Sequence, residues 1–261
     1  MKSDLALILE TAREAGDLAR RMKAQGLKIW SKEGGSPVTD ADIAVDELLK
    51  ARLEAARPDY GWLSEETADD PSRLERSRLF VVDPIDGTAA FLKNKPWWSV
   101  SIAVVEDGKP VAGVVFAPEL DETFTATVGG GAFLNDAAIR ASARDRVEDC
   151  RMLGDAPMFR HPAWREPWPP MTIETRNSIA YRMCLVADGR FDAALALSGK
   201  SEWDLAAADL ICAEASAVCT DHKGRGYAYN QPNPRLPSLI SAAPALHPLI
   251  LERVRHIDLP N

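Results

Sequence analysis

The segment from Leu79 to Thr88 constrains the fold more strongly than any other part of this chain. Four apolar residues, LFVV at 79–82, suffice for a short buried strand, and the sequence DPIDGT follows at 83–88. Aspartate, proline and glycine favour turns, so the chain must bend where the strand ends. The bend can bring the carboxylates of Asp83 and Asp86 together, with the Ile85 carbonyl between them. A simple turn would also explain DPIDGT taken alone, but AAFL at 89–92 predicts that a helix starts here.

Further carboxylates lie outside this segment. Glu65 and Glu66 stand between two strand-like runs, and Asp204 lies far downstream in the sequence WDLAA at 203–207. An acidic pair is usually part of a solvated loop, and Asp204 could serve only as the N-cap of a helix that runs to about Ala217. Carboxylates without His or Cys among them are nevertheless what a hard cation requires, because Mg²⁺ prefers carboxylate and phosphate oxygens. The set indicates Mg²⁺-dependent phosphate chemistry, and the amides after Gly87 could hold a phosphate at a helix N-terminus.

Charge and composition exclude several classes of protein. The net charge of −8 argues against a protein whose main task is to bind nucleic acid, which would need a basic face. The longest uncharged stretch, 237–251, contains three prolines and is too short to span a bilayer, and charges interrupt any apolar signal-peptide core at the N-terminus. The four cysteines show no CxxC spacing, so we expect reduced, buried thiols in a cytoplasmic protein. The histidines are scattered, which argues against zinc.

Periodicity predicts two halves of different character. The first half should contain helices and an antiparallel sheet. Its expected elements are a helix at 4–24, a second helix that starts after Thr39 and Asp42 and ends before Pro58, and strands at 79–82, 99–105, 110–116, 122–128 and 132–135. The sequence DG at 107–108 predicts a tight hairpin turn.

The second half alternates strands and helices, which is typical of an α/β arrangement with a mixed sheet. Its expected elements are helices at 179–188, 204–217 and 245–256 and strands at 191–197 and 238–242. The proline-rich segment 155–171 shows no periodicity. It is either an irregular surface loop or a loop that contacts substrate or another subunit.

Taken together, these motifs resemble those of one family. The pair Glu65-Glu66, then DPIDGT and then WDLAA, is similar to the pattern of the inositol monophosphatase superfamily, whose members are lithium-sensitive, Mg²⁺-dependent phosphatases. The resemblance covers nearly the whole chain and includes Lys32 and Asp42, VSIAV at 100–104, GGAFLN at 130–135 and CLVADG at 184–189. It implies an α+β fold, a layered αβαβα sandwich. The half 1–136 would carry an antiparallel sheet and most metal ligands, and the half 137–261 a mixed α/β sheet, Asp204 and substrate contacts.

The resemblance also implies two metal positions. Glu65, Asp83 and the carbonyl of Ile85 look like ligands of the first Mg²⁺. Asp83, Asp86 and Asp204 look like ligands of the second. Asp83 would therefore be shared between the two ions.

The same resemblance assigns roles beyond metal binding. Thr88 and Glu65 look like the residues that orient and help deprotonate a metal-activated water, and with Asp83 they form the expected catalytic set. Phosphate or substrate would contact Asp86, Gly87, Thr88 and Asp204. Lys32 and Asp42 match positions in a mobile N-terminal loop near the metals.

Substrate choice is where the chain departs from the inositol phosphatases. They usually carry Asn where this chain has Ala90, bisphosphate nucleotidases often carry Glu there, and Leu197 replaces a Glu that contacts inositol hydroxyls. SEWD at 201–204 and YN at 229–230 look more like the bacterial 3′(2′),5′-bisphosphate nucleotidases.

We therefore expect a Mg²⁺-dependent phosphomonoesterase that acts on a small phosphorylated metabolite, with 3′(2′),5′-bisphosphate nucleotidase as the favoured activity. An inositol-1-monophosphatase or broad sugar phosphatase is the alternative, and a regulatory binding protein with a vestigial site is another. We expect no nucleic-acid or membrane partner. A homodimer is possible, since dimers are common in the family.

Overall fold

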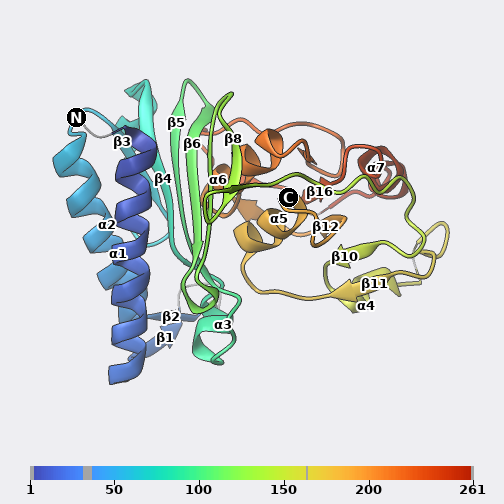
Figure 1. Ribbon diagram of the computed structural model, residues 1–261, viewed down its shortest axis with the longest axis horizontal. Helices are drawn as coiled ribbons and strands as arrows, with labels where there is room; N and C mark the ends of the chain where they lie inside the picture. Colours follow the sequence, from blue (N-terminus) through green and yellow to red (C-terminus); the bar gives the residue numbers. More distant parts are fainter. Residues whose placement is uncertain (1–2, 32–36, 163, 260–261) are drawn as a thin grey trace.

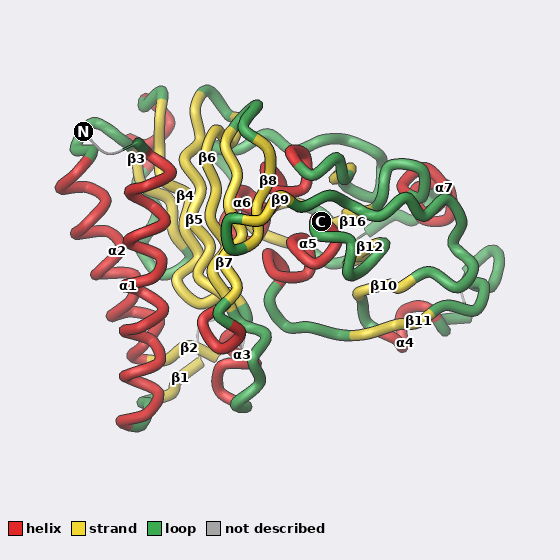
Figure 2. Tube along the Cα trace, viewed as in Figure 1, coloured by secondary structure: helices red, strands yellow, loops and turns green. Residues whose placement is uncertain are grey.

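The computed structural model describes residues 3–31, 37–162 and 164–259. Lys32, which the sequence places near the metal site, lies outside the described residues. Figures 1 and 2 show five successive layers, in which helices and sheets alternate. This arrangement confirms the predicted αβαβα sandwich.

The first layer consists of two long helices, α1 (Asp4–Gln25) and α2 (Asp40–Ala56). They pack on each other and on the strands at 78–86, 99–106 and 109–117, and a core of aliphatic and aromatic side chains lies between helices and sheet. Thr39 and Asp42 form the predicted capping box at the start of α2. A small hairpin, β1 (Ile29–Ser31) and β2 (Pro37–Thr39), leads into that helix.

The second layer is a seven-stranded sheet with its strands in chain order. Its strands are β3 (Gly61–Ser64), β4 (Arg78–Asp86), β5 (Ser99–Glu106), β6 (Lys109–Ala117), β7 (Glu122–Thr127), β8 (Gly131–Leu134) and β9 (Ala137–Ala138). The predicted antiparallel sheet is confirmed, with one parallel pair, β3 and β4, at its edge. Asp107 and Gly108 both have positive φ, as the predicted tight hairpin turn requires.

The third layer is formed by α5 (Ile179–Ala187) and α6 (Glu202–Glu214), which pack on each other and on the central strands. Gly113 of β6 allows α6 to approach closely, because a Cβ there would lie 2.8 Å from the Ala207 carbonyl oxygen. One apolar core contains side chains from both sequence halves. It holds the start of α6 against the end of β4. The division of the chain at residue 136 stays a prediction.

The fourth layer is a mixed five-stranded sheet in the order β11-β10-β12-β16-β14, as predicted. Its strands are β10 (Arg151–Leu153), β11 (Thr172–Glu174), β12 (Ala193–Ala196), β14 (Val218–Thr220) and β16 (Leu239–Ala242). Strand β13 (Lys200–Ser201) directly precedes α6 and pairs with β15 (Arg235–Leu236), which follows α6 in the chain, in a two-stranded ribbon. Helix α7 (His247–Val254) packs on β16 as the last layer.

Short elements complete the chain: α3 (Thr88–Leu92), α4 (Ala156–Phe159), and the 3-10 turns η1 (Pro71–Glu75) and η2 (Pro118–Leu120). The irregular segment 155–171 contains α4, and its Trp164 and Trp168 stack edge to face with ring centroids 5.3 Å apart. Both tryptophans pack against the core beside α7, so the segment is anchored.

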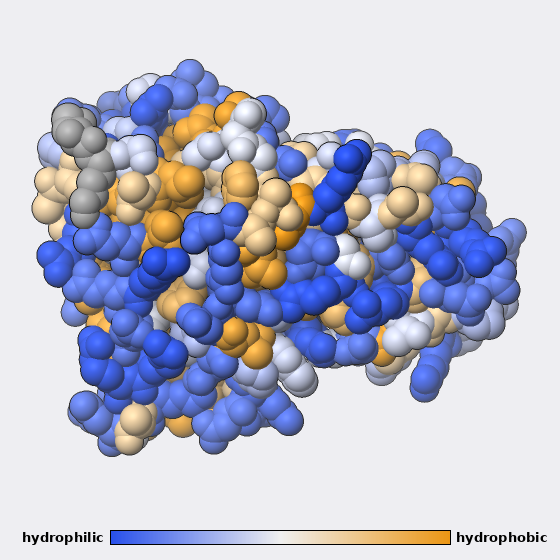
Figure 3. Space-filling view, in the orientation of Figure 1, coloured by the Kyte–Doolittle hydropathy of each residue, from blue (hydrophilic) through white to orange (hydrophobic). Residues whose placement is uncertain are grey.

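The surface is mixed in character. Figure 3 shows hydrophilic residues over most of the face in view, with hydrophobic residues gathered mainly over its central part. No described helix is both long and apolar enough to cross a membrane. All four cysteines are free thiols, as predicted, and three of them are buried.

Candidate metal centre

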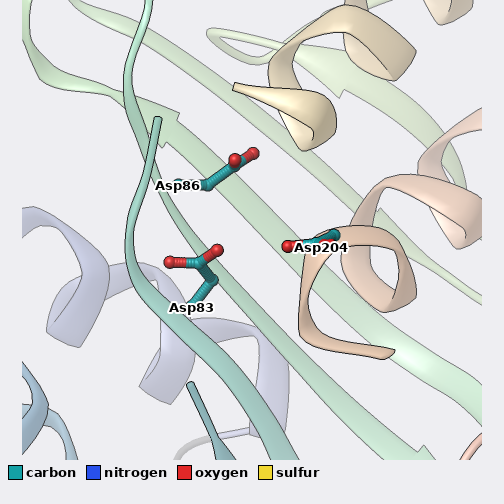
Figure 4. A group of neighbouring side chains, drawn as sticks. All are labelled: Asp83, Asp86 and Asp204. Carbon is teal, nitrogen blue, oxygen red and sulfur yellow. The ribbon is translucent and has the colours of Figure 1, made fainter. Parts of the chain in front are cut away.

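Three aspartates meet where β4 ends and α6 begins. Asp83, Asp86 and Asp204 each offer a carboxylate oxygen, and these oxygens all lie within 4.8 Å of one another. Figure 4 shows the three side chains converging on one space from the two elements. Asp83 is 1% exposed and Asp86 is 5% exposed. The structure therefore brings together three of the predicted metal ligands, two of them almost fully buried.

A β-bulge explains how Asp83 and Asp86 come to share one face. Side chains alternate along a regular strand, so residues three positions apart point to opposite faces of the sheet. In β4 the pairing with β5 shifts register, so that Asp83 lies opposite Ser101 and Asp86 opposite Ser99. Three steps along β4 match two along β5, and this extra residue turns both carboxylates to the same side.

Asp86 is held by the N-terminus of α5. The Ser178 hydroxyl donates to Asp86 Oδ2 at 2.6 Å, the Ala180 amide to Oδ2 at 2.7 Å, and the Ile179 amide to Oδ1 at 3.1 Å. Gly87 makes this approach possible, because with φ of +95° a Cβ there would lie 2.9 Å from the Ser178 nitrogen. Burial raises the pKa of Asp86 to about 6, although the three hydrogen bonds oppose the shift.

Asp204 sits in the first turn of α6, but not at the predicted position. The sequence interpretation placed it at the N-cap, whereas the N-cap is Ser201 and Asp204 is three residues further on, in a capping box. The Ser201 amide donates to Asp204 Oδ2 at 2.7 Å. The expectation was wrong because an aspartate in the third position also satisfies the start of a helix, by accepting from the N-cap amide. Burial, followed by the charge of Asp86, raises the pKa of Asp204 to about 7.

Asp83 is surrounded by other carboxylates. Burial raises its pKa well above the ordinary value, and the charges of Glu65, Asp86 and Asp204 raise it further. Its Oδ1 accepts a hydrogen bond of 3.1 Å from the Ile85 amide, which closes the bend. Several carboxylates that repel one another in a buried space favour a bound cation. The all-oxygen donor set fits Mg²⁺.

Thr88 links the metal centre to the start of α2. Its hydroxyl lies 3.3 Å from Asp42 Oδ1 and 3.2 Å from the Ile85 carbonyl oxygen. Asp42 is almost fully buried, and its Oδ2 accepts from both the amide and the hydroxyl of Thr39 at 2.7 Å. The capping box that starts α2 therefore also fixes the side chain that faces Thr88.

Glu65 follows β3 directly, and its charge raises the pKa of both Asp83 and Asp42, so it lies near these two carboxylates. It is not part of the tight cluster of three aspartates. The loop that contains Glu65 is held in place by Asp46 of α2, which accepts hydrogen bonds from the hydroxyls of Ser64 and Thr67. Gly87 and Thr88 stand at the start of α3, where phosphate contacts stay a prediction.

Sequence reasoning missed the contribution of α5. Ser178 caps that helix by accepting from the Tyr181 amide and also bonds to Asp86, which lies 92 positions earlier. A serine before an apolar run is a readable helix-start signal. The sequence does not reveal which residue the free amides at the start of this helix bind, because that residue is brought there by the packing of distant elements.

Comparison with known proteins identifies the family. The model of the inositol monophosphatase family matches residues 2–259. A histidinol-phosphatase of Mycobacterium tuberculosis is 37% identical over 85% of this chain and 88% of its own length. The 3′(2′),5′-bisphosphate nucleotidase CysQ of Aggregatibacter actinomycetemcomitans is 29% identical over 86% of each chain. The solved structure of a Thermotoga maritima IMPase aligns with a TM-score of 0.83, at 27% identity and over 96% of both chains. This chain therefore belongs to the inositol monophosphatase family and is a phosphoric monoester hydrolase.

Proposed function

We propose that this enzyme requires Mg²⁺ to hydrolyse a small phosphorylated metabolite, and that it prefers a 3′(2′),5′-bisphosphate nucleotide. The observation that supports the metal requirement is the cluster of Asp83, Asp86 and Asp204, whose carboxylate oxygens lie within 4.8 Å of one another. Magnesium, when bound, supplies positive charge that lowers the pKa of a water and offsets negative charge on the phosphoryl group.

The protein itself positions the reactants. The Thr88 hydroxyl can donate its one proton to Asp42 or to the Ile85 carbonyl, and its lone pairs can then accept from the attacking water. Glu65 lies near Asp83 and Asp42 and can take up the proton that the water loses. The amides at the start of α3 can hold phosphate oxygens. In phosphoryl transfer such positioning and charge stabilisation make up most of the catalysis.

Leu197 favours a substrate other than inositol phosphate. It follows β12 directly, and it lines a cavity rather than offering a carboxylate. A second candidate is an inositol or sugar phosphatase, which the similarity to the Thermotoga maritima IMPase supports. Phosphate release from a panel of nucleotide, inositol and sugar phosphates separates the two. A protein that binds these compounds with Mg²⁺ but releases no phosphate would indicate the regulatory alternative.

Glu65→Gln should lower kcat substantially and leave KM within about threefold. The amide keeps the shape of the side chain but cannot take a proton, and an interaction made mainly in the transition state affects kcat rather than substrate binding. Steady-state kinetics at saturating Mg²⁺ measures both constants. If the variant raised only KM, Glu65 would be a binding residue and its proposed role would be wrong.

The wild-type enzyme should hydrolyse 3′-phosphoadenosine 5′-phosphate with a higher kcat/KM than inositol 1-phosphate. Without a polar partner at Leu197, an inositol hydroxyl would be desolvated, at a cost of about 1–3 kcal/mol. That corresponds to roughly a tenfold to hundredfold loss of kcat/KM. The comparison requires equal Mg²⁺ for both compounds. A preference of tenfold or more for inositol 1-phosphate would contradict the substrate assignment and leave the family assignment intact.

A further inference from the structure

A buried glutamate lies in the first turn of α6 and is not part of the aspartate cluster. Glu202 is 0% exposed and stands two positions before Asp204. One of its carboxylate oxygens accepts the amide of Asn230 at 2.6 Å, and the other accepts the amide of Gln231 at 2.8 Å. The Glu202 amide in turn donates to the Pro234 carbonyl at 2.9 Å. A segment that follows α6 in the chain therefore holds the turn that contains Asp204.

A buried arginine holds the same segment from the other side. Arg73 in η1 is 2% exposed. Its Nη1 donates to Asn230 Oδ1 at 2.7 Å, and its Nη2 donates to the Gln231 carbonyl at 2.9 Å. Its Nε and Nη2 also bind the two carboxylate oxygens of Asp69, at 2.6 Å and 3.0 Å. All three guanidinium nitrogens thus have partners, and these partners come from two distant parts of the chain.

Asn230 joins the two buried charged residues. Its backbone amide binds Glu202, its Oδ1 accepts from Arg73, and its Nδ2 donates to the Arg73 carbonyl at 3.2 Å. Its φ of +58° lies in the left-handed region, which asparagine adopts more readily than most residues. Arg73, Asn230 and Glu202 therefore form one continuous network of hydrogen bonds, which we call the Arg73–Glu202 network.

Both ends of the Arg73–Glu202 network are close in sequence to expected metal ligands. Asp69, which binds Arg73, follows Glu65 by four positions in the loop between β3 and η1. At the other end, Glu202 and Asp204 share the first turn of α6. Glu65 and Asp204 come from different halves of the chain, so their separation depends on how α6 is held against the sheet. A metal site tolerates errors of only about 0.5 Å in the placement of its ligands.

We propose that Arg73 and Glu202 are positioning residues of the metal centre, which act together through Asn230 to fix Asp204 relative to Glu65. This inference rests on the proposed Mg²⁺-dependent function and concerns residues that act through the ligands rather than as ligands. Buried charges contribute little net stability, because desolvation offsets much of their attraction. Their charge-assisted hydrogen bonds, however, require one defined geometry. The network is therefore better suited to setting a position than to stabilising the fold.

The test measures Mg²⁺ binding to chelator-treated protein by calorimetry, in the wild type and in an Asp204→Asn background. Asn230→Gly is the sharpest variant, because glycine adopts positive φ freely, keeps the amide that binds Glu202 and removes only the side-chain hydrogen bonds to Arg73. We expect Asn230→Gly to weaken Mg²⁺ binding about threefold in the wild type and to change it little in the Asp204→Asn background, since effects on one shared ligand are not additive.

Glu202→Gln should have a larger effect of the same kind. An amide has one oxygen, so it cannot accept both backbone N–H groups that Glu202 binds. We expect Mg²⁺ binding to weaken about tenfold in the wild type and to change little where Asp204 is already replaced.

Arg190→Gln is the matched control. Arg190 also binds carboxylates, those of Glu122 and Asp188, but it follows the end of α5 opposite to the end that holds Asp86. This variant should lower the melting temperature and leave Mg²⁺ binding unchanged.

The outcomes distinguish this inference from the proposed function. If Asn230→Gly and Glu202→Gln lower only the melting temperature, or weaken Mg²⁺ binding equally in both backgrounds, the network is structural, the inference is wrong and the proposed function stands. If the wild type itself binds no Mg²⁺, the proposed function fails and the inference fails with it. Should Glu202→Gln not fold, as judged by circular dichroism, Asn230→Gly decides the question.

Discussion

Asp83→Asn should abolish phosphate release, with kcat lower by about a thousandfold or more, a barrier increase of roughly 4 kcal/mol. Asp83 is buried at the centre of the aspartate cluster and is the ligand expected to serve both metal positions. An amide has nearly the same shape but lacks the negative charge that a divalent cation requires. Initial rates of phosphate release over a range of Mg²⁺ concentrations measure the loss.

The fold should survive this substitution. An asparagine side chain at this position could still accept the hydrogen bond from the Ile85 amide, and the change removes a buried charge that Glu65, Asp86 and Asp204 repel. Metal-free Asp83→Asn should therefore be at least as stable to urea as the metal-free wild type. A variant that folds normally and keeps more than a tenth of wild-type activity would remove Asp83 from the metal centre.

Much of the fold follows from local patterns that can be read in the sequence. The capping box of Thr39 and Asp42, the Asp107-Gly108 turn and the alternation of the meander strands each involve residues close in sequence. Their physical causes are local, so the predicted elements match the observed ones to within a few residues. The carboxylates of Asp83 and Asp86 were expected to converge for the same reason.

The remaining features depend on contacts between distant segments. DPIDGT signals a bend, but it does not reveal that β4 keeps its pairing with β5 beyond a bulge, which is what turns Asp83 and Asp86 to one face. The position of Ser178 next to Asp86 depends on Gly87 and on the packing of α5.

Removing divalent cations should reduce phosphatase activity to background, and Mg²⁺ should restore it. Among the described residues, the cluster of His, Cys, Asp or Glu side chains suited to a metal consists of aspartates alone, so their charges have to be offset before a phosphate can approach. Lithium should inhibit the restored enzyme, because a small monovalent cation can occupy an oxygen site while supplying less charge. Mg²⁺ should also raise the melting temperature of the wild type, since a ligand that binds only the folded state stabilises it.

The central claim is that Asp83, Asp86 and Asp204 hold the Mg²⁺ on which hydrolysis depends. The most direct test measures phosphate release from 3′-phosphoadenosine 5′-phosphate by chelator-treated wild type during a Mg²⁺ titration, with Asp83→Asn run in parallel. We predict no release without Mg²⁺, saturable recovery in the wild type and none in the variant. Full wild-type activity in excess chelator would contradict the account.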